Sequence, residues 1–256
     1  MFRKALLGAV ALLAGSAVVA YAGPKEDLQA AAKKLADAGS YTWKTTTETA
    51  NQGGFTPGPV EGKTQKDGLT MVTTSFNDQT SITVRQGEKG AVKRGDQEWQ
   101  SLAELQAGGG GGRGRGFGGF GGGGAVAPTT QWEQQIERLT DVKKEGDTYT
   151  STVTGDAVSA FTQFGRGGGR GRGGAGGAGG AGGAGGGQAP AITNGKVTVK
   201  FTVKDGVISK YQMVLQGSMD FNGNQFDLGR TTTTDITNVG TTKVEIPAEA
   251  KAKLAQ

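Results

Sequence analysis

Arginines set among glycines are the first residues of this 256-residue sequence that suggest chemistry. Two tracts, 108–124 and 165–187, hold more than half of the 49 glycines. Arginine beside glycine can follow phosphates and stack on nucleic-acid bases. Strict Arg-Gly-Gly occurs only at Arg166 and Arg172, however. We therefore interpret the tracts as flexible spacers in preference to nucleic-acid-binding segments.

The usual catalytic side chains are absent from the sequence. It contains no histidine and no cysteine, which excludes Ser-His-Asp and Cys-His constellations and zinc–thiolate sites. The G-x-G-x-x-G matches fall inside the tracts, without the strand-turn-helix context that phosphate binding needs. Two carboxylate pairs, Glu145/Asp147 and Asp220/Asp227, lie in turn-rich sequence, where solvated turn residues are the favoured interpretation. We expect no enzyme activity, no metal and no cofactor.

Large apolar side chains on alternating positions remain as the candidate site. Methionine and aromatic residues can line a cavity that accepts an irregular apolar ligand. An ordinary closed core between sheet and helices is the alternative, and the sequence leaves both open. The candidate cavity residues are Trp43, Met71, Phe76, Phe201, Tyr211, Met213, Leu215 and Phe226.

The elements that must position these residues alternate between helical and strand periods. An apolar stripe at i, i+3, i+4, i+7 predicts a helix over 24–39, with Pro24 in its first turn and Gly39 at its end. Further expected elements are strands at 40–49, 69–77 and 80–87, short helices at 101–106, 128–139 and 155–164, and a hairpin at 141–153.

The C-terminal third shows the clearest alternation. Asp205-Gly206 predicts a two-residue turn that places Phe201 close to Tyr211. A second strand pair at 218–239, a closing strand at 241–247 and a short helix at 247–255 complete the chain. The expected fold is α+β: a curved antiparallel half-barrel of about ten strands, covered by a few α-helices, with two disordered glycine-rich loops.

The N-terminus predicts export. Arg3 and Lys4 precede an apolar run that ends in Ala20-Tyr21-Ala22, the pattern of a cleaved secretory signal. We expect 1–22 to be a signal peptide and 23–256 to be one envelope domain, periplasmic or extracellular. An uncleaved membrane anchor is the alternative. Outside the signal and the tracts, acidic residues slightly outnumber basic ones, which is not typical of a nucleic-acid binder.

Several segments together resemble a known group. The run VTVKFTVKDGVISKYQMVLQG, the strand RTTTTDITNVGTTKVEIP, the segment LTDVKKEGDTYTSTVTGDAVSAF and AVKRGDQEW are similar to the Lol-type lipoprotein-carrier and LppX-type lipoprotein fold. The resemblance implies a half-barrel whose concave apolar face is covered by helices and holds acyl chains. This chain lacks the lipobox cysteine of the LppX-type branch, and both glycine tracts are foreign to the group.

Two functions follow as hypotheses. The first is a non-enzymatic carrier or binder of an acyl chain or other apolar ligand in the cell envelope. The second is an exported structural or interaction protein with a closed core, whose tracts make contacts with an envelope protein or a membrane surface. A nucleic-acid partner is not expected.

The first testable prediction concerns the N-terminus. Sequencing of the exported protein is expected to begin at Gly23, because a small-x-small site precedes it. A membrane-bound form that retains Met1 would show an anchor instead.

Overall fold

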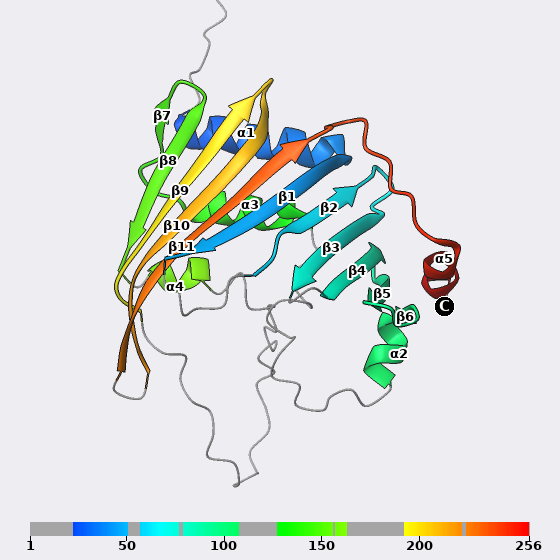
Figure 1. Cartoon of the computed structure of the whole chain (residues 1–256). Helices are drawn as coiled ribbons and strands as arrows, with labels where there is room; N and C mark the ends of the chain where they lie inside the picture. Colours follow the sequence, from blue (N-terminus) through cyan, green and yellow to red (C-terminus); the bar gives the residue numbers. More distant parts are fainter. Residues whose placement is uncertain are drawn as a thin grey trace, which may run out of the picture.

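One antiparallel sheet of eleven strands organises the molecule (Figure 1). Its order is β6-β5-β4-β3-β2-β1-β11-β10-β9-β8-β7, so two meanders join where β1 pairs with β11. The computed structural model describes residues 23–50, 57–76, 79–107, 127–155, 157–162, 192–221 and 224–255. The strands are β1 (Tyr41–Thr49), β2 (Val60–Thr64), β3 (Thr70–Phe76), β4 (Gln79–Gln86), β5 (Lys89–Arg94), β6 (Gln100–Ser101), β7 (Lys143–Glu145), β8 (Thr148–Thr154), β9 (Ile192–Lys204), β10 (Val207–Phe221) and β11 (Asn224–Thr237).

Helices cover part of this sheet. Those in the described residues are α1 (Pro24–Ala38), α2 (Leu102–Ala107), α3 (Pro128–Arg138), α4 (Ala157–Thr162) and α5 (Ala248–Leu254). Helices α1 and α3 pack on each other and lie behind the sheet in Figure 1, where α1 contacts β9 and β10. The face that they cover is here named the inner face. The predicted fold class, a curved antiparallel sheet with a few helices, is confirmed.

Helix α1 forms as its sequence predicts. Pro24 occupies its first turn, and Gly39 ends it in the left-handed conformation, donating its N–H to the Ala36 carbonyl. The stripe of Leu28, Ala31, Ala32 and Leu35 is buried against the sheet. Packing of this stripe, more than intrinsic helix propensity, stabilises a helix of this length.

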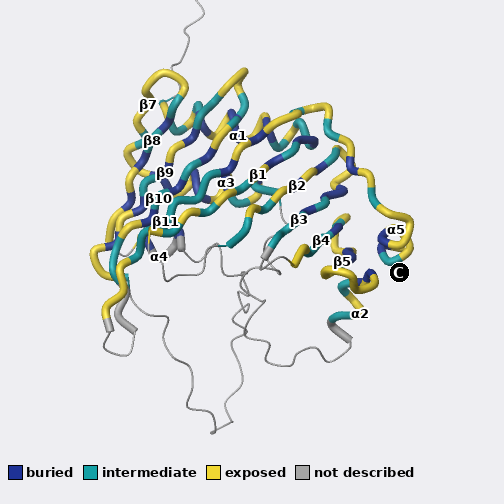
Figure 2. The backbone as a smooth tube through the Cα atoms, viewed as in Figure 1, coloured by how far each residue is buried: buried dark blue, intermediate teal, exposed yellow. Residues whose placement is uncertain are grey.

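The hairpin of β9 and β10 also has the predicted register. Asp205 and Gly206 both have positive φ, as a type I′ turn requires. Phe201 pairs with Tyr211, and their ring centroids lie 4.9 Å apart. The inner face of β8, β9 and β10 therefore forms the centre of the main core. Figure 2 shows the resulting alternation of buried and exposed residues along the strands.

A second, smaller core lies on the opposite face. Val72 and Met71 are neighbours in β3, and side chains of neighbouring strand residues point to opposite faces. Val72 belongs to the main core, whereas Met71 packs against the second core. The buried residues of the second core are Leu69, Val84, Ala91, Trp99, Val244, Ala250 and Leu254.

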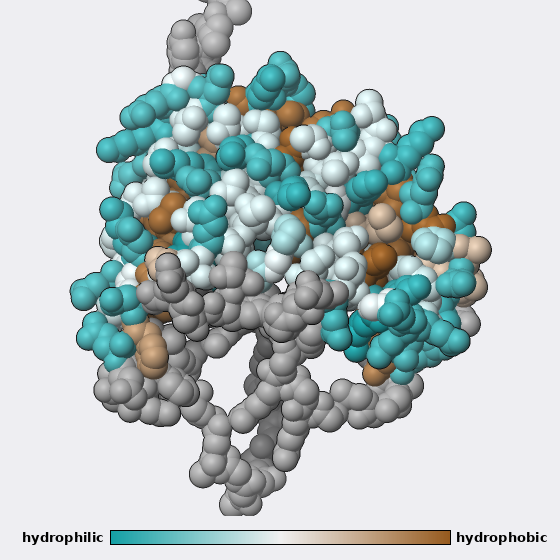
Figure 3. All heavy atoms as spheres, viewed as in Figure 1, coloured by the Kyte–Doolittle hydropathy of each residue, from teal (hydrophilic) through white to brown (hydrophobic). Residues whose placement is uncertain are grey.

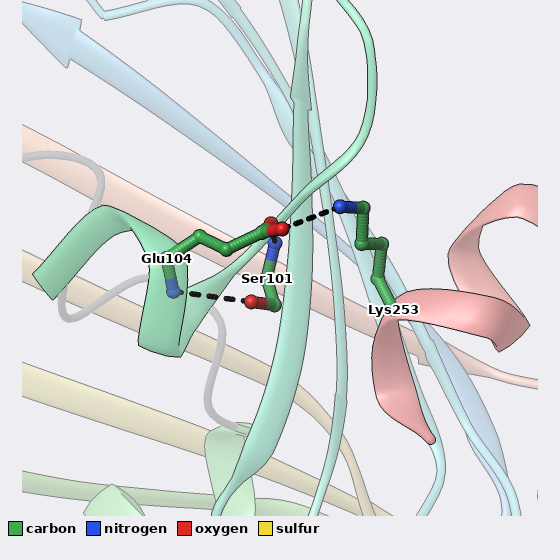
Figure 4. A network of polar contacts seen from close by, with 3 residues as sticks. All are labelled: Ser101, Glu104 and Lys253. Carbon is green, nitrogen blue, oxygen red and sulfur yellow. Dashed lines mark hydrogen bonds and ion pairs between the residues drawn. The ribbon is translucent and has the colours of Figure 1, made fainter. Parts of the chain in front are cut away.

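A polar network ties α5 to the sheet edge (Figure 4). Ser101 and Glu104 form a capping box at the start of α2: the Ser101 N–H donates to Glu104 Oε2 at 2.7 Å, and the Glu104 N–H donates to Ser101 Oγ at 3.1 Å. Lys253 Nζ of α5 donates to Glu104 Oε1 at 2.6 Å. This last bond is the main reason that the pKa of Glu104 is lowered. Together these contacts cover the short edge strand β6.

The segment 241–247 corrects one prediction. It was expected to be the closing strand, yet it pairs with no described strand. Strand β11 already has β1 on one side and β10 on the other, so no free edge lies beside it. The Val244 N–H instead donates a hydrogen bond to the side chain of Gln65, at 2.8 Å from Oε1. Strand β2 is an element that the sequence interpretation did not name.

Two further predictions lie outside the described residues. These are the signal peptide 1–22 and the tracts 108–124 and 165–187. Within the described ranges, no helix has the length and hydropathy to cross a membrane.

The second testable prediction concerns Gly62 in β2. The Trp43 indole lies where a β-carbon of residue 62 would stand, so Gly62→Ala forces a buried aromatic ring to move. We expect the free energy of unfolding to fall by about 1–3 kcal/mol in denaturant titration. Lys63→Ala, at the exposed neighbouring position, should change it by less than about 0.5 kcal/mol. Equal effects at both positions would contradict this account.

Candidate functional site

The predicted cavity residues occupy several places in the structure. Trp43, Phe201, Tyr211, Met213 and Leu215 are buried together in the main core. Met71 packs against the second core on the opposite face. Phe226 is exposed, and Phe76 ends β3, with its side chain outside the described part of the structure. The structure thus brings five of the eight into one layer between the inner face and the helices.

An aromatic cluster fills the centre of this layer. Trp132 of α3 lies 6.1 Å from Phe201 and 5.4 Å from Tyr211 between ring centroids. The Trp132–Phe201 contact is edge-to-face, a favoured arrangement of aromatic rings. The sequence placed Trp132 on the apolar face of a helix but did not include it among the site residues. The apolar helical face that Trp132 shares with Ile136 was the signal available in the sequence. That this face lies opposite the Phe201–Tyr211 pair is visible only in the structure.

Two buried polar atoms in the layer have no hydrogen-bond partner. They are the Tyr211 hydroxyl and Gln135 Oε1, in residues that are only 4% and 5% exposed. Burial raises the pKa of Tyr211 and the neighbouring Gln135 side chain acts in the opposite direction, but no contact between the two meets hydrogen-bond geometry. Buried polar groups in proteins nearly always have partners. Within the described residues, these two atoms are therefore the polar groups of the layer that the chain itself leaves unsatisfied.

A second tyrosine in the same layer shows the ordinary arrangement. The Tyr41 hydroxyl lies 3.0 Å from Thr129 Oγ1 at the start of α3. Burial raises the pKa of Tyr41, and the bond to Thr129 partly opposes that rise. Tyr41 is therefore satisfied by the chain itself, and Tyr211 is not.

A half-buried cation, Arg230, lies on the same face of β11 as Thr234, the register partner of Tyr211, four residues along the strand. Burial raises the pKa of Tyr211, while the positive charge of Arg230 acts in the opposite direction. Burial lowers the pKa of Arg230. Its Nε donates to Thr232 Oγ1 at 3.5 Å, and no carboxylate of the described residues forms an ion pair with it. The layer between the inner face and the helices therefore contains a hydroxyl, a carboxamide and a guanidinium among apolar side chains.

The inner face becomes hydroxyl-rich beyond Tyr211. Thr45 of β1 and Thr234 of β11 are paired in register, and their hydroxyl oxygens lie 2.8 Å apart. The next inner-face pair toward the end of β1, Thr47 and Thr232, is half-buried. These hydroxyls form a polar border to the apolar layer on the side of β1.

An open pocket of about 450 Å³ lies elsewhere, beside α5. Figure 3 shows apolar atoms gathered in this region, at the right of the view. Its floor is apolar and its rim polar, and the lining comprises Gln65, Asp67, Leu69, Gln86, Val244, Ile246, Lys251, Leu254 and Ala255. The polar rim is largely satisfied by its own chain: Asp67 accepts from the Leu69 N–H at 3.0 Å and from Gln65 Nε2 at 2.9 Å. The unpartnered atoms of the inner layer are the stronger sign of a ligand.

In the part of the chain that the structure describes, no group of three acidic residues is placed to hold a metal ion. The tyrosine, glutamine and arginine of the inner layer are hydrogen-bonding groups, suited to holding a polar head of a ligand.

Comparison with known proteins gives a fold likeness. No family model and no curated protein sequence matches the chain. The crystal structure of the Mycobacterium tuberculosis lipoprotein LppX is similar at a TM-score of 0.42 and 11% identity, over 84% of this chain and 97% of that one. The crystal structure of LprF from Mycobacterium bovis is similar at a TM-score of 0.41 and 11% identity, over 89% of this chain and 97% of that one. Both likenesses agree with the resemblance suspected from the sequence, and they concern the course of the chain alone.

The third testable prediction compares the two buried tyrosines. Tyr211→Phe removes an unpartnered hydroxyl and should raise the free energy of unfolding by about 1 kcal/mol, whereas Tyr41→Phe removes a hydrogen bond and should lower it by about 1 kcal/mol. Denaturant titration of both variants measures the difference in sign. A loss of stability in Tyr211→Phe would show that the hydroxyl has a partner within the chain.

Proposed function

We propose that this protein is an exported, non-enzymatic carrier that binds an acyl chain or another apolar molecule between the inner face and helices α1 and α3. The observation that carries the proposal is the pair of unpartnered polar atoms, Tyr211 hydroxyl and Gln135 Oε1, inside an apolar layer. A closed core satisfies its buried polar groups. A ligand site instead places a few polar groups in an apolar lining, where they orient the ligand.

The side chains of the layer suit a flexible apolar ligand. Met213 can adapt to an irregular chain because its thioether side chain is unbranched and polarizable. Trp132 occupies the space above Phe201 and Tyr211, so a ligand enters by displacing α3 and this ring. The role of Trp132 is then to fill the layer while no ligand is held.

Helix α3 can move without disturbing the sheet. One tie is the Tyr41–Thr129 hydrogen bond at its start. Others are the bonds from Lys25 Nζ of α1 to the carbonyls of Glu137 and Leu139, each 2.8 Å long. None of these bonds belongs to the strand ladder. Helix α1 is itself held to the sheet by the Asp27–Lys144 ion pair and by the bond from Lys34 Nζ to the Asp205 carbonyl, so α3 would open away from α1.

The polar groups favour a ligand with a hydrogen-bonding or negatively charged head. Tyr211 can donate or accept, and a glutamine side chain can present either its oxygen or its amide nitrogen. Arg230 adds a positive charge without an acidic partner in the described residues. A fatty-acid carboxylate meets all three requirements and is the natural probe.

The envelope location of this carrier rests on the predicted signal peptide. A secretory signal would place the chain in the cell envelope, where membrane lipids are at hand as ligands.

The fourth testable prediction concerns binding. Protein purified without detergent should show co-purifying lipid in native mass spectrometry and should bind a fluorescent long-chain fatty acid saturably. Tyr211→Phe should weaken that binding about threefold to tenfold, the worth of one hydrogen bond. Met213→Glu should abolish it, because a charge would face the apolar layer.

The control is Tyr41→Phe, which changes a tyrosine of the same layer that already has its partner. Its affinity should not fall below that of the wild type, because the change loosens one tie of α3 and removes no group proposed to hold the ligand head. A wild type that binds no fatty acid under any condition and shows a mass free of lipid would overturn the proposal and support a closed-core structural protein.

A further inference from the structure

The hairpin of β10 and β11 extends beyond its neighbours (Figure 1). The two strands remain paired up to Phe221 and Asn224. On one side, the pairing with β1 ends at Arg230, and one further bond joins the Ala50 N–H to the Gly229 carbonyl. On the other side, the pairing with β9 ends at Met219. Beyond Arg230, β11 is therefore paired with β10 alone, and beyond Met219 the hairpin is paired with no other described strand. This end of the hairpin is here named the ribbon.

This ribbon carries an exposed aromatic residue. Phe226 is 48% exposed, and it is the one large apolar side chain in the described residues that is so exposed. Its register partner is Met219, and Phe221 ends β10, so the sequence of the hairpin end holds three large apolar residues beside Asp220 and Asp227. Leaving such a side chain in water forgoes the free energy that its burial would provide.

The exposed residue is in line with the inner layer. Residues two apart on a strand share a face, so Phe226, Leu228 and Arg230 form one row on β11. The row continues to Thr234, which pairs with Tyr211. Arg230 follows Phe226 by four residues, or about 13 Å along the strand. In elements that contact membranes, an aromatic side chain reaches toward the acyl chains, and cations lie nearer the phosphates. Phe226 at the end and Arg230 behind it follow that order.

The size of the ribbon favours a lipid surface over a protein partner. Two strands about 5 Å apart and a few residues long offer only a few hundred Å², well below the roughly 800 Å² per partner of a stable protein interface. A bilayer needs no matching surface, and one inserted aromatic side chain contributes directly to binding.

We propose that the end of the β10–β11 hairpin docks on a lipid bilayer by inserting Phe226. The negative charge of the exposed Asp227, next to Phe226 in the sequence, is repelled by an anionic lipid surface. Insertion of the Phe226 ring is therefore the contribution that drives docking. Docking requires no ligand in the inner layer, and it is tested separately from the proposed carrier function.

Co-sedimentation with phosphatidylcholine vesicles tests the docking. Phe226→Ser in the full chain should lower the vesicle partition constant about tenfold or more. Gln225→Ser, at the exposed neighbouring position, should leave it unchanged. Adding anionic lipid should not strengthen the binding of the wild type. Circular dichroism checks that each variant is folded.

Tryptophan fluorescence of a second variant, Phe226→Trp, reports directly on the surroundings of residue 226. The three natural tryptophans, Trp43, Trp99 and Trp132, are all buried. In Phe226→Trp, the emission of the new indole should shift to shorter wavelength when vesicles are added and should be quenched by brominated lipids. This readout is independent of the form of the N-terminus.

Three results would overturn docking: an equal partition constant for Phe226→Ser and wild type, no spectral response in Phe226→Trp, or a loss of self-association in Phe226→Ser without a change in vesicle binding. Fatty-acid affinity should be the same in Phe226→Ser and wild type. Failure of docking would thus leave the carrier proposal intact, and failure of fatty-acid binding would leave docking intact.

Discussion

The pairing of β1 with β11 holds the molecule together. It joins Thr42 to Thr237 and runs to Thr49 and Arg230, linking residues nearly two hundred positions apart. The entropic cost of closing a long loop grows only slowly with its length. The hydrogen bonds of the β1–β11 ladder and the burial of Trp43 and Ile236 offset that cost. Without this ladder, the two meanders would be separate sheets with long exposed edges.

The same pairing places the helices. Helix α1 directly precedes β1, so the position of β1 beside β11 brings α1 back over β9 and β10. Helix α3 then packs against α1 and lays Trp132 on Phe201 and Tyr211. The inner layer is thus a consequence of strand order, and its polar groups meet because three elements far apart in the chain converge there.

Stability and function make opposite demands on this layer. Dense packing of aromatic and aliphatic side chains stabilises the sheet, yet the layer retains a tyrosine and a glutamine whose polar atoms have no partner. Such atoms are costly in a low-dielectric interior. Proteins commonly keep locally unfavourable groups at functional sites, where the compensation comes from a ligand. The second core borders an open pocket, yet the carboxylate of Asp67 in its lining is hydrogen-bonded within the chain.

The sequence by itself determined the elements whose signals are local. Pro24, Gly39 and the stripe between them specify α1, and Asp205-Gly206 specifies the hairpin that pairs Phe201 with Tyr211. Cap and turn residues act on their near neighbours, so their consequences can be predicted without knowing the rest of the fold.

Only the tertiary structure decided which face each residue serves. Alternation placed Met71 on one side of its strand but did not indicate that α5, and not α1, covers that side. The segment 241–247 has the composition of a strand, but both edges of β11 were already taken. The Tyr211 hydroxyl is influenced by Gln135 of α3 and Arg230 of β11, and such convergence depends on contacts between distant segments, which no local pattern encodes.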